Sequence, residues 1–130
     1  SLSSIDVTNN AQLLDLRLND TNITSIDLAA NTLLTTFYCS LSEISAIDLS
    51  NNLNLTKLNL ENNLLTGALD FSNHTQLIQL ELYINDVTSL NVKNGNNTNF
   101  TSFNALGNSN LTCIRVDDAA YSTTNWTNID

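Results

Sequence analysis

Apolar and polar positions recur along this chain with a period of about 21 residues. The fullest copy has apolar residues at Leu55, Leu58, Leu60 and Leu65, with the polar residue Asn63 before the last of them. The x-Leu-x-Leu-x part alternates with the period of two that a half-buried strand requires. Repetition at a fixed period of this size predicts a solenoid, in which each copy stacks on the next and buries a continuous core.

Four further copies keep these positions, and each copy ends in an apolar-polar-apolar tripeptide that also alternates like a strand. The chain therefore predicts two parallel sheets back to back, with little helix. The copies are Leu13, Leu16, Leu18, Thr21 and Ile23; Leu34, Phe37, Cys39, Ser42 and Ile44; Leu77, Leu80, Leu82, Asn85 and Val87; and Phe100, Phe103, Ala105 and Asn108, with Leu111 in the last apolar position. The tripeptides begin at Ile5, Ile26, Ile47, Leu69, Leu90 and Ile114.

The order L-x-x-L-x-L-x-x-N-x-L resembles the leucine-rich repeat family, and the repeat length and second half resemble its short bacterial class of about 21 residues. The resemblance covers nearly the whole chain. It implies a mainly β leucine-rich repeat solenoid with two parallel sheets. We expect a single domain over 1–130, with a partial repeat at 1–10, repeats over 11–116 and a C-terminal cap at 117–130.

The C-terminal segment breaks the period, as the terminal units of solenoids do because they must cover the open end of the core. We expect a short helical turn at 118–121 and a lid made by Tyr121 and Trp126. The stretch 111–126 also resembles the end of leucine-rich repeat regions in secreted, cell-surface proteins of Bacteroidota. That resemblance implies an extracellular or cell-surface location.

Polar residues at two fixed positions of the repeat predict two ladders inside the turns. An Asn amide has both donors and acceptors, so it can satisfy the backbone groups that a turn directs inward. We interpret His74 as a turn residue that replaces Asn in the second ladder. The first ladder is Thr21, Ser42, Asn63, Asn85 and Asn108, and the second is Asn10, Asn31, Asn52, His74 and Gly95.

The charge balance excludes two classes of partner. The chain has 4 Lys and Arg against 13 Asp and Glu, a formal net charge of -9, which repels phosphate backbones and anionic lipid. No apolar run approaches the ~18 residues of a spanning helix, so membrane insertion is not expected either.

The polar residues of the tripeptides form an acidic column, Asp6, Asp27, Asp48 and Asp70, on successive outward positions. One interpretation is Ca²⁺ bound between the turns, because hard cations take carboxylate oxygens. The interpretation that we favour is hydrogen bonding to nearby Ser, Thr and Asn, because no calcium-loop motif is present. No metal or other cofactor is expected.

Five large residues stand at positions predicted to face outward from the main sheet: Tyr38, Leu41, Tyr83, Ile84 and Leu106. Their exposure on one face would indicate a contact site, since such sites are enriched in Tyr and apolar residues. The alternative is that they are ordinary scattered surface residues.

Catalysis is not expected, because His74 is the only His and no nucleophile or phosphate-loop motif accompanies it. Cys39 and Cys113 stand three copies apart, too far to form a disulfide, and we expect two small buried thiols. The sequence thus predicts a monomeric, non-catalytic extracellular recognition module that binds a protein or glycan through the main sheet. The alternative is a structural spacer or surface-layer segment, possibly stabilised by calcium along the acidic column.

Overall fold

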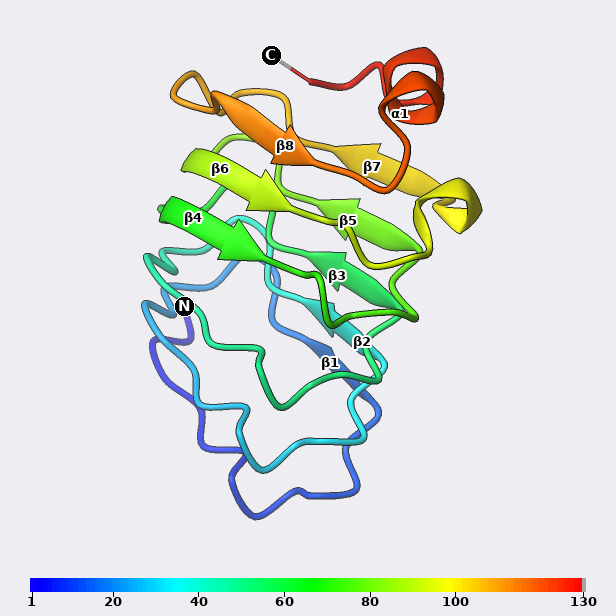
Figure 1. The fold of residues 1–130 in the computed structure, drawn as a ribbon. Coiled ribbons are helices and arrows are strands. Elements are labelled where there is room, and N and C mark those ends of the chain that lie inside the picture. The colour runs from blue at the N-terminus through cyan, green and yellow to red at the C-terminus, as the bar shows by residue number, and fades with distance from the viewer. Residues whose placement is uncertain (130) are drawn as a thin grey trace.

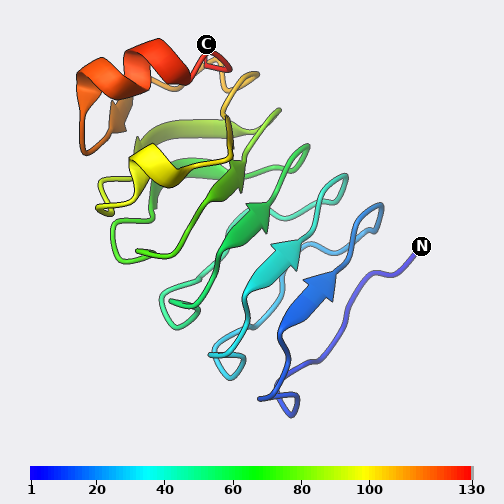
Figure 2. The ribbon, with the colours of Figure 1, turned by 90° about the vertical axis from the view of Figure 1, so that its right-hand side faces the viewer.

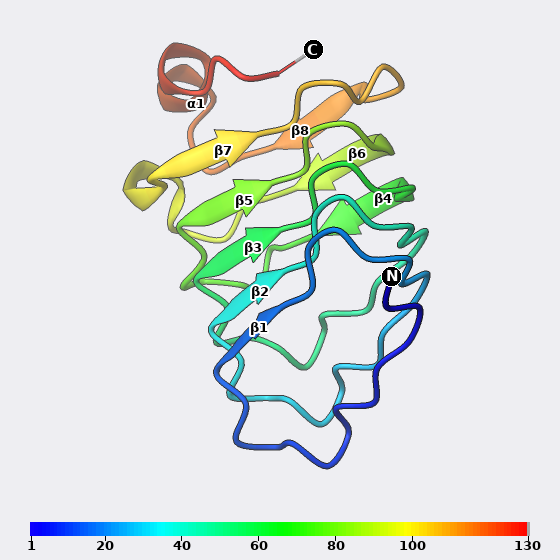
Figure 3. The same cartoon turned by 180° about the vertical axis from the view of Figure 1, so that it is seen from behind.

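Five short parallel strands form the longer of two sheets, which we call sheet A (Figures 1 and 3). The computed structural model describes residues 1–129. The strand order is β1-β2-β3-β5-β7, and each strand is the x-Leu-x part of one copy, so Leu16 pairs with Phe37 and Leu58 with Leu80. The strands are β1 (Asp15–Arg17), β2 (Thr36–Tyr38), β3 (Lys57–Asn59), β5 (Gln79–Glu81) and β7 (Ser102–Asn104).

Three strands form the second parallel sheet, sheet B, in the order β4-β6-β8 on the other side of the core (Figure 1). They are β4 (Thr66–Asp70), β6 (Asp86–Asn91) and β8 (Cys113–Arg115), and each contains the first two residues of one of the last three tripeptides. The register of β4 on β6 shifts between Gly67 and Ala68. The prediction of a mainly β leucine-rich repeat solenoid with two parallel sheets and little helix is confirmed.

The first three tripeptides, at 5–7, 26–28 and 47–49, do not form the strands predicted for them. Side-chain amides join the turns here: Asn31 Nδ2 donates to Val7 O at 3.0 Å, and Asn52 Nδ2 donates to Leu28 O at 3.0 Å. The carbonyl oxygen of the tripeptide's last residue therefore accepts a hydrogen bond from a side-chain amide of the next turn. The second ladder, and not a backbone ladder, holds this side of the solenoid together.

Apolar residues of the repeat fill the space between the two sides in one cluster. Leu111 packs against this cluster, as expected for the drifted last copy. The members without any exposed surface are Ile23, Leu34, Phe37, Cys39, Ile44, Leu55, Leu58, Leu60, Leu65, Leu77, Leu80, Leu82, Val87, Val92 and Ala105.

The C-terminal end of the core is covered by aromatic stacking. The Trp126 ring stacks on the Phe103 ring with centroids 4.1 Å apart and also contacts Phe100. The expected helical turn is present and longer, as α1 (Ala119–Asn125), with Asp118 as its N-cap. A short 3-10 helix, η1 (Asn97–Asn99), precedes β7. The predicted cap extends to Asp130, which lies outside the described residues.

The first ladder satisfies backbone groups at each turn. Asn63 Nδ2 donates to Cys39 O at 2.7 Å and to Leu60 O at 3.1 Å, while its Oδ1 accepts from Ile44 N at 3.0 Å. Asn85 and Asn108 make the equivalent bonds one and two turns further on. These hydrogen bonds hold the turns that follow the sheet A strands. They therefore also position the exposed residues of those turns.

The second ladder differs from the prediction in its last rung. Asn94, not Gly95, takes that position, and its Nδ2 donates to His74 O at 3.0 Å. Gly95 follows with a φ of 78°, and its N–H donates to the Asp117 carboxylate. The misassignment arose because the last copy is longer than the others, so counting from its tripeptide does not locate the buried Asn.

Candidate binding surfaces

The turns beyond sheet A form a surface of their own, which we call the turn face (Figure 2). Each turn closes over the first ladder, so the ladder residue points inward and its neighbours point outward. One outward residue of each turn has a left-handed backbone, with φ between 52° and 72°. These residues are Asp20, Leu41, Asn62, Ile84 and Gly107.

Two of these left-handed positions hold residues that are poorly suited to them. Asp, Asn and Gly adopt positive φ with little strain, whereas a β-branched or bulky residue there is a genuine outlier. Leu41 has a φ of 54° and Ile84 a φ of 52°, yet their side chains are 53% and 41% exposed. Each of these two residues therefore has about 1–2 kcal/mol of backbone strain, while its side chain is only partly buried.

The five residues of the predicted contact site divide between two surfaces. Leu41, Tyr83, Ile84 and Leu106 lie on the turn face, whereas Tyr38 alone lies on sheet A, in β2. These four residues follow the sheet A strands by two or three positions, so their placement differs from the predicted position within the main sheet. That the five residues form a contact site stays a prediction. Sequence reasoning also missed Leu64, which is 57% exposed on the turn face.

Tyr38 is held in place on sheet A by its neighbours. The Arg17 guanidinium carbon lies 4.9 Å from the centre of the Tyr38 ring, and the Tyr38 hydroxyl donates to Gln79 Oε1 at 3.0 Å. Arg17 in turn forms a two-bond ion pair with Asp15, at 2.9 and 3.0 Å, and this hydrogen bonding lowers the pKa of the Asp15 carboxyl. The exposed side of sheet A is thus polar and largely satisfied by its own contacts.

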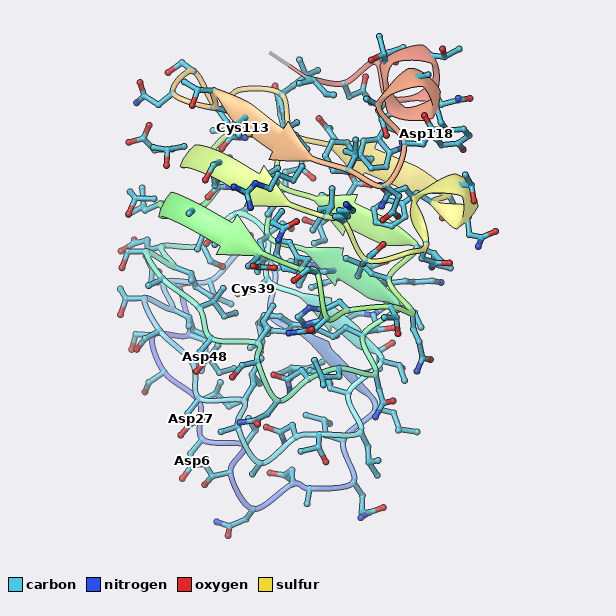
Figure 4. All side chains as sticks on the ribbon, viewed as in Figure 1. Asp6, Asp27, Cys39, Asp48, Cys113 and Asp118 are labelled. Carbon is cyan, nitrogen blue, oxygen red and sulfur yellow. The ribbon has the colours of Figure 1, made fainter. Side chains whose placement is uncertain are left out.

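The acidic column lies along the opposite side of the solenoid (Figure 4). Asp6 Oδ1 accepts from the Thr8 N–H at 2.9 Å and from its hydroxyl, and Asp48 Oδ1 accepts from the Ser50 N–H. Asp27 and Asp70 accept from the N–H two residues on in the same way. Hydrogen bonding to Thr8, Ser50 and Ser72 lowers the pKa of Asp6, Asp48 and Asp70 respectively.

These bonds fold each Asp back onto its own turn, so successive carboxylates do not converge on a common point. Across residues 1–129, no three His, Cys, Asp or Glu side chains are grouped as a metal ion requires. A hollow of about 350 Å³ does open beside this column, between Asp48 and Asp70, and is lined by Leu53 and His74. The Asp48 and Asp70 carboxylates that line this hollow each accept a hydrogen bond from the backbone N–H two residues on.

His74 occupies its ladder position as a buried, neutral ring. Its Nε2 lies 3.2 Å from Leu49 O, so Nε2 carries the proton and Nδ1 is left as an acceptor. The ring packs edge-on against Phe71, and burial lowers its pKa. The burial of the His74 imidazole and its bond to a backbone carbonyl agree with the interpretation of His74 as a turn residue.

The cysteines are both free thiols, and only one of them is buried. Cys39 lies inside the solenoid, where burial raises the pKa of its thiol (Figure 4). Cys113 is exposed, contrary to the prediction of two buried thiols, because it takes an outward position of β8.

A solved structure of the functional domain of InlJ from Listeria monocytogenes, described as including a cysteine ladder, is similar to this chain. The two align with a TM-score of 0.63 and 25% sequence identity over 86% of this chain. The match covers 31% of the InlJ chain, so this chain spans about a third of that structure. No protein-family model matches the chain, and no curated protein does either. The similarity shows a solenoid of the bacterial leucine-rich repeat type.

Proposed function

We propose that this chain is a non-catalytic recognition module that binds a protein or a glycan at, or outside, the cell surface. Its contacts are made by the turn face, with Leu41, Tyr83, Ile84 and Leu106, and by Tyr38 on the adjoining sheet. The similarity to a bacterial leucine-rich repeat structure supports an interaction module. The extracellular location rests on the resemblance of stretch 111–126 to secreted repeat proteins.

The observation that carries the proposal is the conformation of Leu41 and Ile84. Three of the five left-handed positions hold Asp, Asn or Gly, so the turn itself does not require an apolar residue. Leu41 and Ile84 add strain and expose apolar surface to water. Residues held in sparsely populated conformations cluster at functional sites, where another constraint retains them. Contact with a ligand provides that constraint.

Tyr38 supports the same conclusion from the sheet side. Its ring is fixed between Arg17 and Gln79 before any ligand arrives, so little side-chain entropy is lost on contact. A half-buried Tyr with a fixed ring is typical of a binding surface, because Tyr offers a large rigid area.

The test is capture of ligands from cell-surface extracts and on a glycan panel, with the unaltered domain and two double variants. Leu41→Asn/Ile84→Asn removes the apolar residues of the turn face and replaces them with a residue suited to positive φ. Tyr38→Ser/Tyr83→Ser removes one aromatic ring from each surface. We expect the unaltered domain to retain a ligand that both folded variants lose. Equal retention by all three proteins would refute the proposal.

A further inference from the structure

The turn face combines apolar residues with carboxylates and has a uniform sign of charge. Its large exposed or half-buried apolar side chains are Leu41, Leu64, Tyr83, Ile84 and Leu106, spread over four successive turns. Residues in adjacent turns are about 4.8 Å apart, the spacing of paired strands. Leu41 and Ile84, two turns apart, are therefore separated by about 10 Å along the solenoid.

Four carboxylates lie among these apolar residues: Asp20, Glu43, Glu61 and Asp86. In the described part of the chain, the turn segments at 19–22, 40–43, 61–64, 83–86 and 106–109 contain no Lys or Arg. The strands of sheet A are different, because Arg17 and Lys57 there balance Asp15 and Glu81. The turn face is thus the side adjoining sheet A that has unbalanced negative charge.

A hollow of about 420 Å³ lies on this face around Leu41, with Asp20 and Glu43 both in its lining. Asn22, whose Nδ2 donates to Glu43 Oε1 at 2.9 Å, and Asn62 also line it. The lining also includes Ser1, Thr21 and Ser42, so Leu41 is its one apolar residue. An exposed leucine beside two carboxylates suits a side chain with a long apolar stem and a cationic head. Lys and Arg side chains have this form.

We propose that the partner of the turn face is a basic amphipathic protein segment, whose Lys or Arg heads meet Asp20 and Glu43 while its apolar residues cover Leu41, Leu64 and Ile84. The inference rests on the proposed function and names the ligand class of that site. Side chains seven residues apart on a helix are about 10.5 Å apart, which matches the separation of Leu41 and Ile84. A neutral glycan offers no counter-charge to four carboxylates.

The test uses two synthetic helical peptides of about 18 residues with the same apolar face, one with Lys and one with Glu on its polar face. Calorimetry measures their binding to the intact domain, to Asp20→Asn/Glu43→Gln, and to Asp6→Asn/Asp27→Asn as a matched control. The control removes the same charge from the acidic column, which lies outside the turn face. The Leu41→Asn/Ile84→Asn variant tests the apolar contribution.

We expect the Lys peptide to bind the domain, and the Glu peptide not to bind. Affinity for the Lys peptide falls at least tenfold in Asp20→Asn/Glu43→Gln and in Leu41→Asn/Ile84→Asn, and is within twofold of the unaltered value in the control. Equal losses in the control and in Asp20→Asn/Glu43→Gln, or no binding of the Lys peptide, would overturn the inference. If extract ligands still depend on Leu41 and Ile84 in that case, recognition by the turn face stands and only the partner class is wrong.

Discussion

Ile84 lies directly over Gly107 on the turn face, so close that a Cβ on Gly107 would meet Ile84 Cγ1 at 3.0 Å and Ile84 N at 3.1 Å. Gly107 also has a φ of 72°, so two separate constraints require glycine there. We expect Gly107→Ala to destabilise the fold by about 2–4 kcal/mol, from backbone strain and overpacking together.

The matched control for this change is Gly95→Ala, which has a similar φ of 78° but no atom within 4 Å of the added Cβ. It isolates the backbone strain, about 1 kcal/mol. Chemical denaturation of both variants measures the difference. Equal destabilisation by the two substitutions would mean that Ile84 does not pack on Gly107 as described.

A second prediction concerns the first ladder. Asn63→Ala removes three donated hydrogen bonds and one accepted bond, and leaves Cys39 O and Ile44 N unsatisfied inside the solenoid. Each unsatisfied buried group costs about 1–3 kcal/mol, so for two groups we expect about 2–6 kcal/mol of destabilisation in urea unfolding. Asn54→Ala serves as control, because its side chain makes only exposed bonds, one to Thr32 O and a long one from Gln76 Nε2. It should cost under ~1 kcal/mol.

His74 makes stability depend on pH in a defined window. Burial lowers its pKa below the ordinary 6.5, so the unfolded chain binds a proton that the folded chain resists. The contribution of neutral His74 is therefore complete above about pH 6.5 and is lost as pH falls below that value. The carboxyl groups with lowered pKa act in a lower window, below about pH 4.

We expect thermal stability to decrease between pH 7 and pH 5 in the unaltered domain and to change much less in His74→Asn. Asn is the ladder residue in the two preceding turns, so this variant should fold. Melting curves at both pH values measure the effect. A His74→Asn variant with the same pH dependence as the unaltered domain would contradict the assignment to His74.

The effect of calcium on thermal stability distinguishes the proposed recognition module from a calcium-stabilised spacer. Each Asp of the acidic column binds the N–H two residues on, and successive carboxylates do not form a common site. Six to eight oxygens are needed around Ca²⁺. We expect the melting temperature to be the same with calcium and with a chelator. A clear rise with calcium would support the spacer alternative.

The repeat pattern predicted the fold because each apolar position recurs in several copies and its burial is required in all of them. Leu58 and Leu80 illustrate this, since both are buried and paired in sheet A. The strands of sheet B were predicted less well, because Asn31 and Asn52 can replace backbone bonds with side-chain bonds and the pattern does not distinguish the two.

The candidate site was predicted in composition but not in placement. The sequence identified Leu41, Tyr83 and Ile84 as unusually apolar, but it could not show that the chain has left the sheet at those residues. The turn depends on a residue with positive φ. Asn or Gly at that position indicates such a turn in the sequence, whereas Leu or Ile does not. Asp20, Asn62 and Gly107 occupy the equivalent position in the other turns. Aligning the copies at these three residues would have located the turn face.

A ligand that contacts the turn face can be captured there by photo-crosslinking. A photoreactive benzophenone side chain in place of Leu64, which is exposed among Leu41 and Ile84, is irradiated in surface extract. The control has the same group in place of exposed Ser25, which lies outside the turn face. We expect a crosslinked partner from position 64 and none from position 25. Crosslinking from position 25 alone, or equally from both, would contradict it.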